Sequence, residues 1–127
     1  MTQSFNEADP AARMRAAIGD LSGVELFNNQ VLCVVYTRPD KVGGLYMPDS
    51  IIKEDEIQGK AGLILKKGAG AFVDDDGKWF SGASLDVGDW VIFRSSDGWR
   101  LKINGVLCRI FDDVSIKGKV DHPERIY

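Results

Sequence analysis

Two strongly apolar runs, Val31–Tyr36 and Ala61–Lys66, are separated by a long and mostly polar segment, Arg38–Lys60. Val31–Tyr36 is apolar at successive positions, as in a strand that is covered on both faces or joined to a subunit interface. A connection between neighbouring strands usually takes only a handful of residues. The segment is therefore too long for an ordinary hairpin turn, and the fold has to accommodate it as a long loop.

The interior of this loop contains an apolar triplet between a glycine pair and a proline. In chain order these residues are Gly43, Gly44, Leu45, Tyr46, Met47 and Pro48. Apolar side chains gain nothing by remaining in water, so a solvent-exposed loop has no structural use for the triplet. Two interpretations remain open: the triplet folds back on its own domain as a satellite cluster, or it is the tip of a flexible arm that docks in a partner's groove.

The motifs of the chain resemble, in order and spacing, those of the GroES-like co-chaperonin (10 kDa chaperonin) family. Gly-Gly-Leu-Tyr-Met-Pro-Asp-Ser at residues 43–50 is similar to that family's mobile loop, a Gly-Gly pair before an apolar tripeptide. The resemblance continues through Gln58–Lys60, Gly68–Gly70, Leu85–Phe93, Leu101–Gly105 and Val106–Val114. The family usually has Ile, Val or Leu where this chain has Tyr46 and Met47, and a divergent or phage-encoded member is left open.

The resemblance implies a mostly β fold, a small GroES-like β-barrel over residues 21–117 with a mobile loop at 38–60. It also implies a roof hairpin at 71–83 that lines the central opening of a dome. The tip of that hairpin is Asp74, Asp75, Asp76 and Gly77. Asp-Gly is a tight-turn signal, and three aspartates repel one another, so the tip should lie in solvent. A ring of carboxylates and a merely solvated turn are both open interpretations.

The function that the resemblance implies is that of a cytoplasmic co-chaperonin. It would be a heptameric ring that docks on a nucleotide-bound, ATP-driven chaperonin double ring through the loop tip and encloses folding substrates. The alternative is a structural assembly protein, such as a virion decoration or ring component, that reuses the barrel without binding a chaperonin. The features that motivate this alternative are the additions at residues 1–20 and 118–127.

The N-terminal addition carries the signals of a short helix. Asp9 can cap it, Pro10 suits its first position and Gly19 can end it. One face would hold the apolar residues Ala11, Met14, Ala17 and Ile18. A helix of about ten residues is marginal alone and has to pack on something, usually its own domain.

Strands are expected throughout the remainder of the chain. The apolar runs are Val24–Phe27, Val31–Tyr36, Gly62–Leu65, Trp90–Phe93, Trp99–Ile103 and Val106–Phe111. Asn104-Gly105 is a second hairpin signal. By resemblance, Asp112–Ile116 leads into a last short strand. Gly118–Tyr127 runs past that end, and Asp121–Tyr127 within it is expected to be an extended tail.

Composition and the reactive residues argue against several function classes. The net charge of −3 and the pI near 5.1 argue against nucleic-acid binding, and no apolar run approaches a membrane span. Cys33 and Cys108 lie inside apolar runs without the spacing of a zinc site, so they are expected to be buried free thiols. A disulfide between them, on adjacent strands, is the lesser alternative, and nothing in the sequence requires it. His122 is expected to be exposed and inert in the tail. We therefore predict a non-enzyme without a metal or cofactor.

Overall fold

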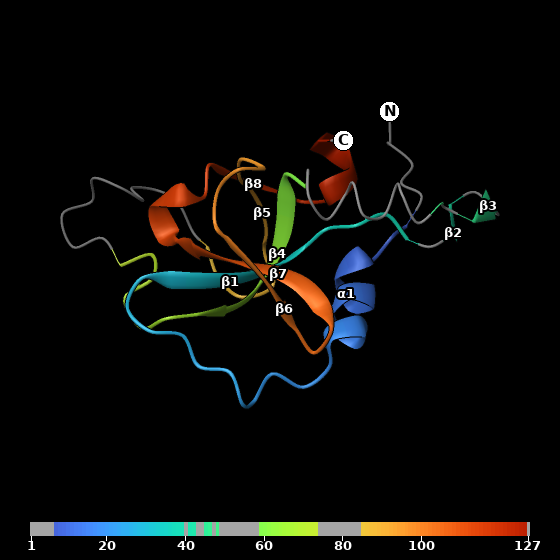
Figure 1. The fold of residues 1–127 in the computed structure, drawn as a ribbon. Helices are drawn as coiled ribbons and strands as arrows, with labels where there is room; N and C mark the ends of the chain where they lie inside the picture. Colours follow the sequence, from blue (N-terminus) through green and yellow to red (C-terminus); the bar gives the residue numbers. More distant parts are fainter. Residues whose placement is uncertain are drawn as a thin grey trace.

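The computed structural model describes residues 7–39, 41–42, 45–46, 48, 59–73 and 85–126. Within these ranges the chain forms one α-helix, eight strands and two 3-10 turns (Figure 1). In chain order the elements are α1 Pro10–Ile18, β1 Gln30–Val35, β2 Lys41–Val42, β3 Leu45–Tyr46, β4 Ala61–Lys67, β5 Trp90–Ile92, β6 Trp99–Ile103, β7 Val106–Asp112, η1 Asp113–Ser115, β8 Gly118–Val120 and η2 Pro123–Ile126.

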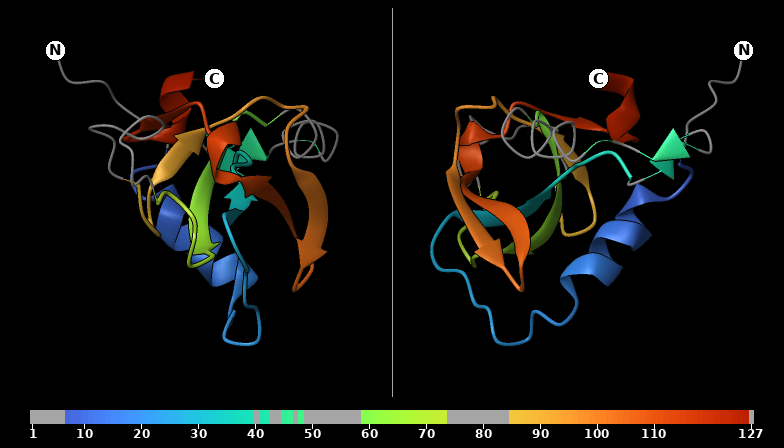
Figure 2. Two further views of the ribbon diagram at one scale, coloured as in Figure 1. Left: turned by 90° about the vertical axis from the view of Figure 1, so that its left-hand side faces the viewer. Right: turned by 45° about the vertical axis from the view of Figure 1, so that its right-hand side comes forward.

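Six of the strands form one antiparallel sheet in the order β6-β7-β1-β4-β5-β8, and β2 pairs separately with β3. The sheet is curved, and α1 lies against one side of it (Figure 2). The predicted fold class, mostly β with one short helix, is confirmed. Among the described residues, no helix is long and apolar enough to cross a membrane.

The central strand β1 is covered on both faces, as its continuous apolar run predicts. Leu32, Val34 and Tyr36 belong to one hydrophobic cluster, which also contains Met14 and Ile18 of α1. Val31 and Cys33 of β1 pack in a second cluster with Ile64, Val91, Phe93 and Phe111. The sheet therefore has a hydrophobic core on each side of β1, and α1 belongs to one of them.

The short helix begins and ends at the predicted residues. The Asp9 side chain accepts a hydrogen bond from the Ala12 amide at 3.2 Å, and Gly19 ends the helix with φ +72°. Met14 and Ile18 are buried, but Ala17 is exposed, so the apolar face is narrower than predicted. Because α1 packs on the sheet of its own chain, the hydrophobic effect can stabilise a helix too short to persist alone.

Three predictions about individual segments of the chain were wrong. Val24–Phe27 is not a strand: it is an irregular segment, and the Lys66 side chain donates to the Val24 carbonyl at 2.7 Å. The segment after β7 turns as η1 instead of continuing as a last short strand. The last strand is instead β8, which pairs with β5, and the predicted extended tail after it forms the turn η2 at Pro123–Ile126.

His122 is buried, contrary to the expected exposed position; only 6% of its surface is exposed. The following Pro123 is also buried, in η2. The tip of the predicted roof hairpin, Asp74–Gly77, lies outside the described residues. The division of the chain near residues 20 and 117 stays a prediction.

Candidate functional site

The long loop leaves the sheet from β1 and returns into β4, two strands that pair with each other. Val35 lies opposite Gly62 in their antiparallel register, and the Tyr36 amide donates to the Ala61 carbonyl at 2.9 Å. The two ends of the loop therefore lie side by side at one end of the most buried strand pair. We call this place, residues 36–37 and 59–61, the loop root.

The loop root is packed and hydrogen-bonded. Tyr36 is buried, and its ring meets the Trp90 ring edge to face with centroids 5.8 Å apart. On the returning side, the Phe93 amide donates to the Lys60 carbonyl at 3.0 Å, and Gly59 is buried. Strands β1, β4 and β5 thus fix both sides of the loop root, which is what a loop that functions as an arm requires of its scaffold.

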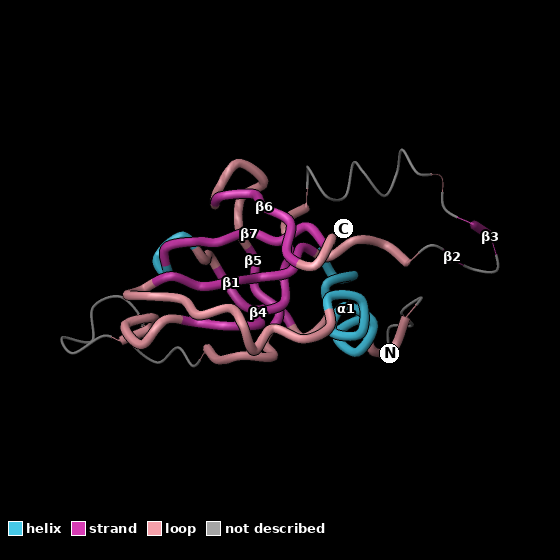
Figure 3. The backbone as a smooth tube through the Cα atoms, turned by 60° about the horizontal axis from the view of Figure 1, so that its bottom comes forward, coloured by secondary structure: helices cyan, strands magenta, loops and turns pink. Residues whose placement is uncertain are grey.

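The structure describes three of the six residues that the sequence analysis predicted to bind a partner. Leu45 and Tyr46 form β3, which pairs with β2 in the register Val42 opposite Leu45 and Lys41 opposite Tyr46. This two-stranded ladder lies beyond α1, away from the six-stranded sheet (Figure 3). Pro48 is exposed. The remaining predicted residues, Gly43, Gly44 and Met47, lie outside the described part of the chain.

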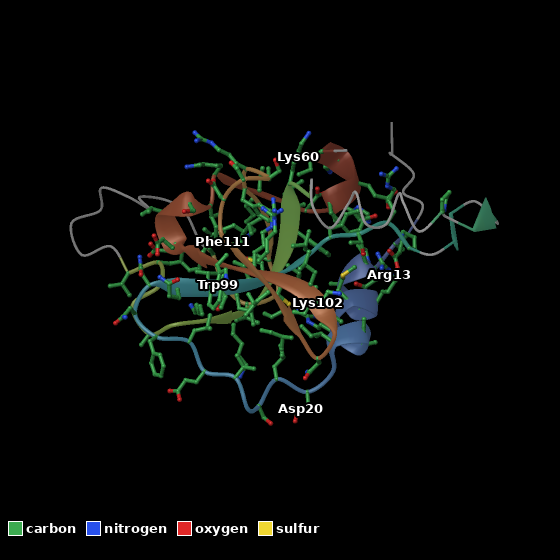
Figure 4. All side chains as sticks on the ribbon, in the orientation of Figure 1. Arg13, Asp20, Lys60, Trp99, Lys102 and Phe111 are labelled. Atoms are coloured by element: carbon green, nitrogen blue, oxygen red, sulfur yellow. The ribbon has the colours of Figure 1, made fainter. Side chains whose placement is uncertain are left out.

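Sequence reasoning missed a charged contact at the loop root. Arg13 reaches from α1 toward the chain that leaves β1 (Figure 4), and its Nη2 donates to the Thr37 carbonyl at 2.6 Å. Its Nε forms an ion pair with Glu7 at 2.8 Å, and its guanidinium carbon lies 5.9 Å from the centroid of the Tyr36 ring. No motif signals this contact, because Arg13 and Thr37 are brought together only by the packing of α1.

Phe72, near the start of the predicted roof hairpin, is also anchored by a residue that the sequence analysis did not single out. The carboxylate of Asp113, itself buried, accepts from the Phe72 amide at 3.0 Å and from the Asn29 side chain at 3.2 Å. Phe72 has φ +60°, a left-handed conformation that is strained for a bulky side chain. The Asp113 contact offsets part of that strain and fixes the backbone at Phe72.

The two cysteines are free and buried, as predicted. They lie on neighbouring strands, but Cys33 belongs to one hydrophobic cluster and Cys108 to the other, so their thiols lie on opposite faces of the sheet. Burial raises the pKa of Cys108 to about 11 and the pKa of Cys33 further still. Thiols with raised pKa values are protonated and unreactive at neutral pH, which fits packing rather than nucleophilic chemistry.

The comparison with known proteins agrees with the fold. No protein-family model matches the chain. The sequence is 31% identical over 84 residues to the protein named Co-chaperonin GroES of Neorickettsia sennetsu (strain ATCC VR-367 / Miyayama). The aligned region covers 66% of this chain and 80% of that relative. Identity of this level over most of the relative's length, together with the mostly β fold, shows that the chain belongs to the GroES co-chaperonin family.

Proposed function

We propose that this protein is a co-chaperonin. In this proposal a ring of subunits, seven by resemblance, docks on a nucleotide-bound chaperonin double ring and closes the chamber in which substrates fold. The relationship to Co-chaperonin GroES over 84 residues is the observation that carries the proposal. The position of the long loop supports it, because both ends of the loop are fixed on a buried strand pair.

The loop would supply the contact with the chaperonin. Leu45, Tyr46 and Met47 are the proposed anchors, with Gly43 and Gly44 permitting the turn and Pro48 restricting the unbound loop. The ladder that contains Leu45 and Tyr46 lies away from the six-stranded sheet, which supports an arm over a satellite cluster (Figure 3). Tyr46 and Met47 depart from the aliphatic residues usual at these positions, and they would adapt the tip to its own partner groove.

The energetics of loop binding suit a lid that has to dissociate from the chaperonin. Ordering a flexible segment costs about 1–2 kcal/mol per residue in backbone entropy, so a single loop binds weakly even with an apolar tip. Several loops on one ring bind with avidity, because each later loop is held at high effective concentration. A modest change in the affinity of each loop then changes the affinity of the whole ring strongly.

The structural-assembly alternative loses the observation that motivated it. That alternative rested on the two terminal additions as devices that join subunits. Where the structure describes them, both additions pack on their own chain: Met14 and Ile18 of α1 join the hydrophobic core, and β8 pairs with β5. Neither addition therefore requires a second subunit to bury its apolar residues.

Native mass spectrometry of the protein, alone and with a chaperonin double ring plus ADP, tests the proposal. We expect a ring that joins the double ring only when nucleotide is present. The variant Tyr46→Asp should abolish the complex while leaving the ring intact, because a carboxylate would lose its hydration in an apolar groove. Trp99→Asp is the control, since Trp99 is an exposed aromatic residue on β6, outside the loop. A wild-type ring that ignores the chaperonin, or a Tyr46→Asp ring that still binds it, would contradict the proposal.

A further inference from the structure

The two ends of the chain meet beside the loop root. The Nε2 atom of His122 lies 2.6 Å from the carbonyl oxygen of Glu7, and the Glu124 amide donates to Nδ1 of His122 at 3.1 Å. Because Nδ1 accepts a hydrogen bond, the proton of the neutral ring is on Nε2 and is donated to Glu7. The Glu7 amide in turn donates to the Glu124 carboxylate at 3.2 Å. Two of these hydrogen bonds, from His122 to the Glu7 carbonyl and from the Glu7 amide to Glu124, thus join segments more than a hundred residues apart in sequence.

Glu7, the N-terminal partner in this junction, is also connected through Arg13 to the side of the loop root where the chain leaves β1. The Glu7 carboxylate accepts from Arg13 Nε through both of its oxygens, at 2.8 and 3.0 Å. The same guanidinium donates from Nη2 to the Thr37 carbonyl at 2.6 Å. The Glu7 side chain is 19% exposed and that of Arg13 is 30% exposed, so the pair is largely shielded from water. Shielding makes this charge-assisted contact stronger than a surface ion pair.

The C-terminal partner lies against the returning side of the loop. Turn η2 contacts β4, the strand that begins at Ala61, and Ile126 packs against the hydrophobic cluster that contains Ala61 and Tyr36. Pro123 of the same turn is fully buried. Figure 1 shows η2 and the start of α1 at the end of the sheet from which the loop leaves. Both sides of the loop root are therefore held, one by α1 and one by η2. Glu7 links the two holders, because it is hydrogen-bonded both to Arg13 of α1 and to Glu124 of η2.

We propose that Glu7, Arg13, His122 and Glu124 form a terminal clamp that positions the loop, with Arg13 as its positioning residue. The clamp fixes Thr37 in addition to the strand residues, so the held part of the outgoing chain extends to Thr37. Releasing Arg13 would free Thr37 and raise the entropy that is lost when the loop docks. The effect of the clamp on the loop root does not depend on the proposed function, whereas its effect on docking rests on that function.

Hydrogen exchange of the free, full-length protein tests the clamp without any partner. In Arg13→Met we expect exchange in peptides that cover residues 35–39 and 59–62 to accelerate at least tenfold, while peptides from β6 and β7 remain unchanged. Arg15→Met is the matched control, because Arg15 is an exposed arginine on the same helix. Arg13→Lys keeps the charge but lacks the forked donors that reach Glu7 and Thr37 together, so it should restore only part of the protection. Unchanged exchange at the loop root in Arg13→Met and in Arg13→Lys would overturn the clamp.

Affinity for a chaperonin double ring with ADP is the second measurement. We expect Arg13→Met to weaken binding of the ring at least tenfold and Arg15→Met to leave it unchanged. A loosened loop root with wild-type affinity would overturn the positioning role of Arg13. A wild-type protein that does not bind the chaperonin would overturn the proposed function alone, since the exchange measurement decides the clamp by itself.

Discussion

The Nη1 atom of Arg109 lies 2.6 Å from the carbonyl oxygen of Ser95, although Arg109 is fully buried in β7. The same atom donates to the Asp97 carbonyl at 2.9 Å, and the guanidinium carbon lies 5.2 Å from the centroid of the Phe93 ring. Burial lowers the pKa of the Arg109 guanidinium, which nevertheless stays charged in proteins. A buried cation is tolerated here because carbonyl oxygens and an aromatic face replace its hydration.

Replacement of Arg109 by methionine should therefore destabilise the fold. Methionine fills much of the space but leaves the Ser95 and Asp97 carbonyls without this donor, at a cost of about 1–3 kcal/mol. Arg100→Met is the matched control, because exposed Arg100 donates to the same Ser95 carbonyl at 2.9 Å. Its effect should stay within about 0.5 kcal/mol. Urea unfolding measures both variants, and equal effects would show that the buried position of Arg109 is unimportant.

The turn between β5 and β6, whose carbonyls accept hydrogen bonds from Arg109, also requires a glycine. Gly98 has φ +84°, and a Cβ atom there would lie 2.6 Å from Cε1 of Phe111. Gly98→Ala should lower the free energy of unfolding by about 1–3 kcal/mol, because it adds backbone strain and a clash with a buried ring. Gly23→Ala is the control: its Cβ would have no neighbour within 4 Å. A loss for Gly98→Ala no larger than for Gly23→Ala, by thermal unfolding, would contradict this account.

Asn104 joins the β6–β7 hairpin to the end of α1. It occupies the hairpin turn with φ +51°, and its side-chain amide donates to the Ile18 carbonyl at 2.8 Å and to the Asp20 carbonyl at 2.9 Å. Asn104→Gly keeps the turn conformation accessible but removes both hydrogen bonds. We expect a loss of about 1–2 kcal/mol in unfolding free energy, at about 1 kcal/mol for each bond.

Hydrogen exchange separates the two roles of Asn104. In Asn104→Gly, amides of α1 should exchange faster, while the ladder between β6 and β7 should be unchanged. Gly105→Ala is the complementary variant, because Gly105 has φ +80° but no neighbour within 4 Å of a Cβ atom. That substitution should weaken the hairpin first. Faster exchange of the hairpin alone in Asn104→Gly would show that its contact with α1 is dispensable.

Local signals in the sequence predicted the elements that depend on local chemistry. The cap at Asp9, the helix end at Gly19 and the turn at Asn104 are each specified by side chains within a few residues. The burial of β1 on both faces followed from its continuous apolar run. The place of the long loop between β1 and β4 followed from the two runs that flank it.

Contacts between distant segments could not be predicted in this way. His122 is buried because its Nε2 meets the carbonyl of a residue 115 positions away, and nothing near it in sequence indicates such a partner. Arg13 and Arg109 look like ordinary surface arginines in the sequence, yet each donates to a backbone carbonyl of another segment of the chain. Val24–Phe27 has the composition of a strand but remains irregular, since composition does not supply a strand partner.

The raised pKa values of the two buried thiols predict a loss of stability at alkaline pH. The pKa of Cys108 rises from 9.0 to about 11 on folding, and the pKa of Cys33 rises further. Above pH 9 the unfolded chain loses its thiol protons while the folded chain retains them, so ionisation favours the unfolded state. The contribution of the two thiols to the unfolding free energy is constant below pH 8. Above pH 9 the unfolding free energy should fall by up to about 1.4 kcal/mol per pH unit for each thiol.

Urea unfolding between pH 7 and pH 10.5 measures this decline. Lysines and tyrosines titrate in the same range, so the informative comparison is with the double variant Cys33→Ala/Cys108→Ala, which keeps those groups. The double variant should start less stable at pH 7, because alanine leaves small cavities in both clusters. Its stability should then decline less steeply, so that the two curves converge toward pH 10.5. Parallel curves would mean that the thiols ionise equally in the folded and unfolded chains, against the burial seen at both positions.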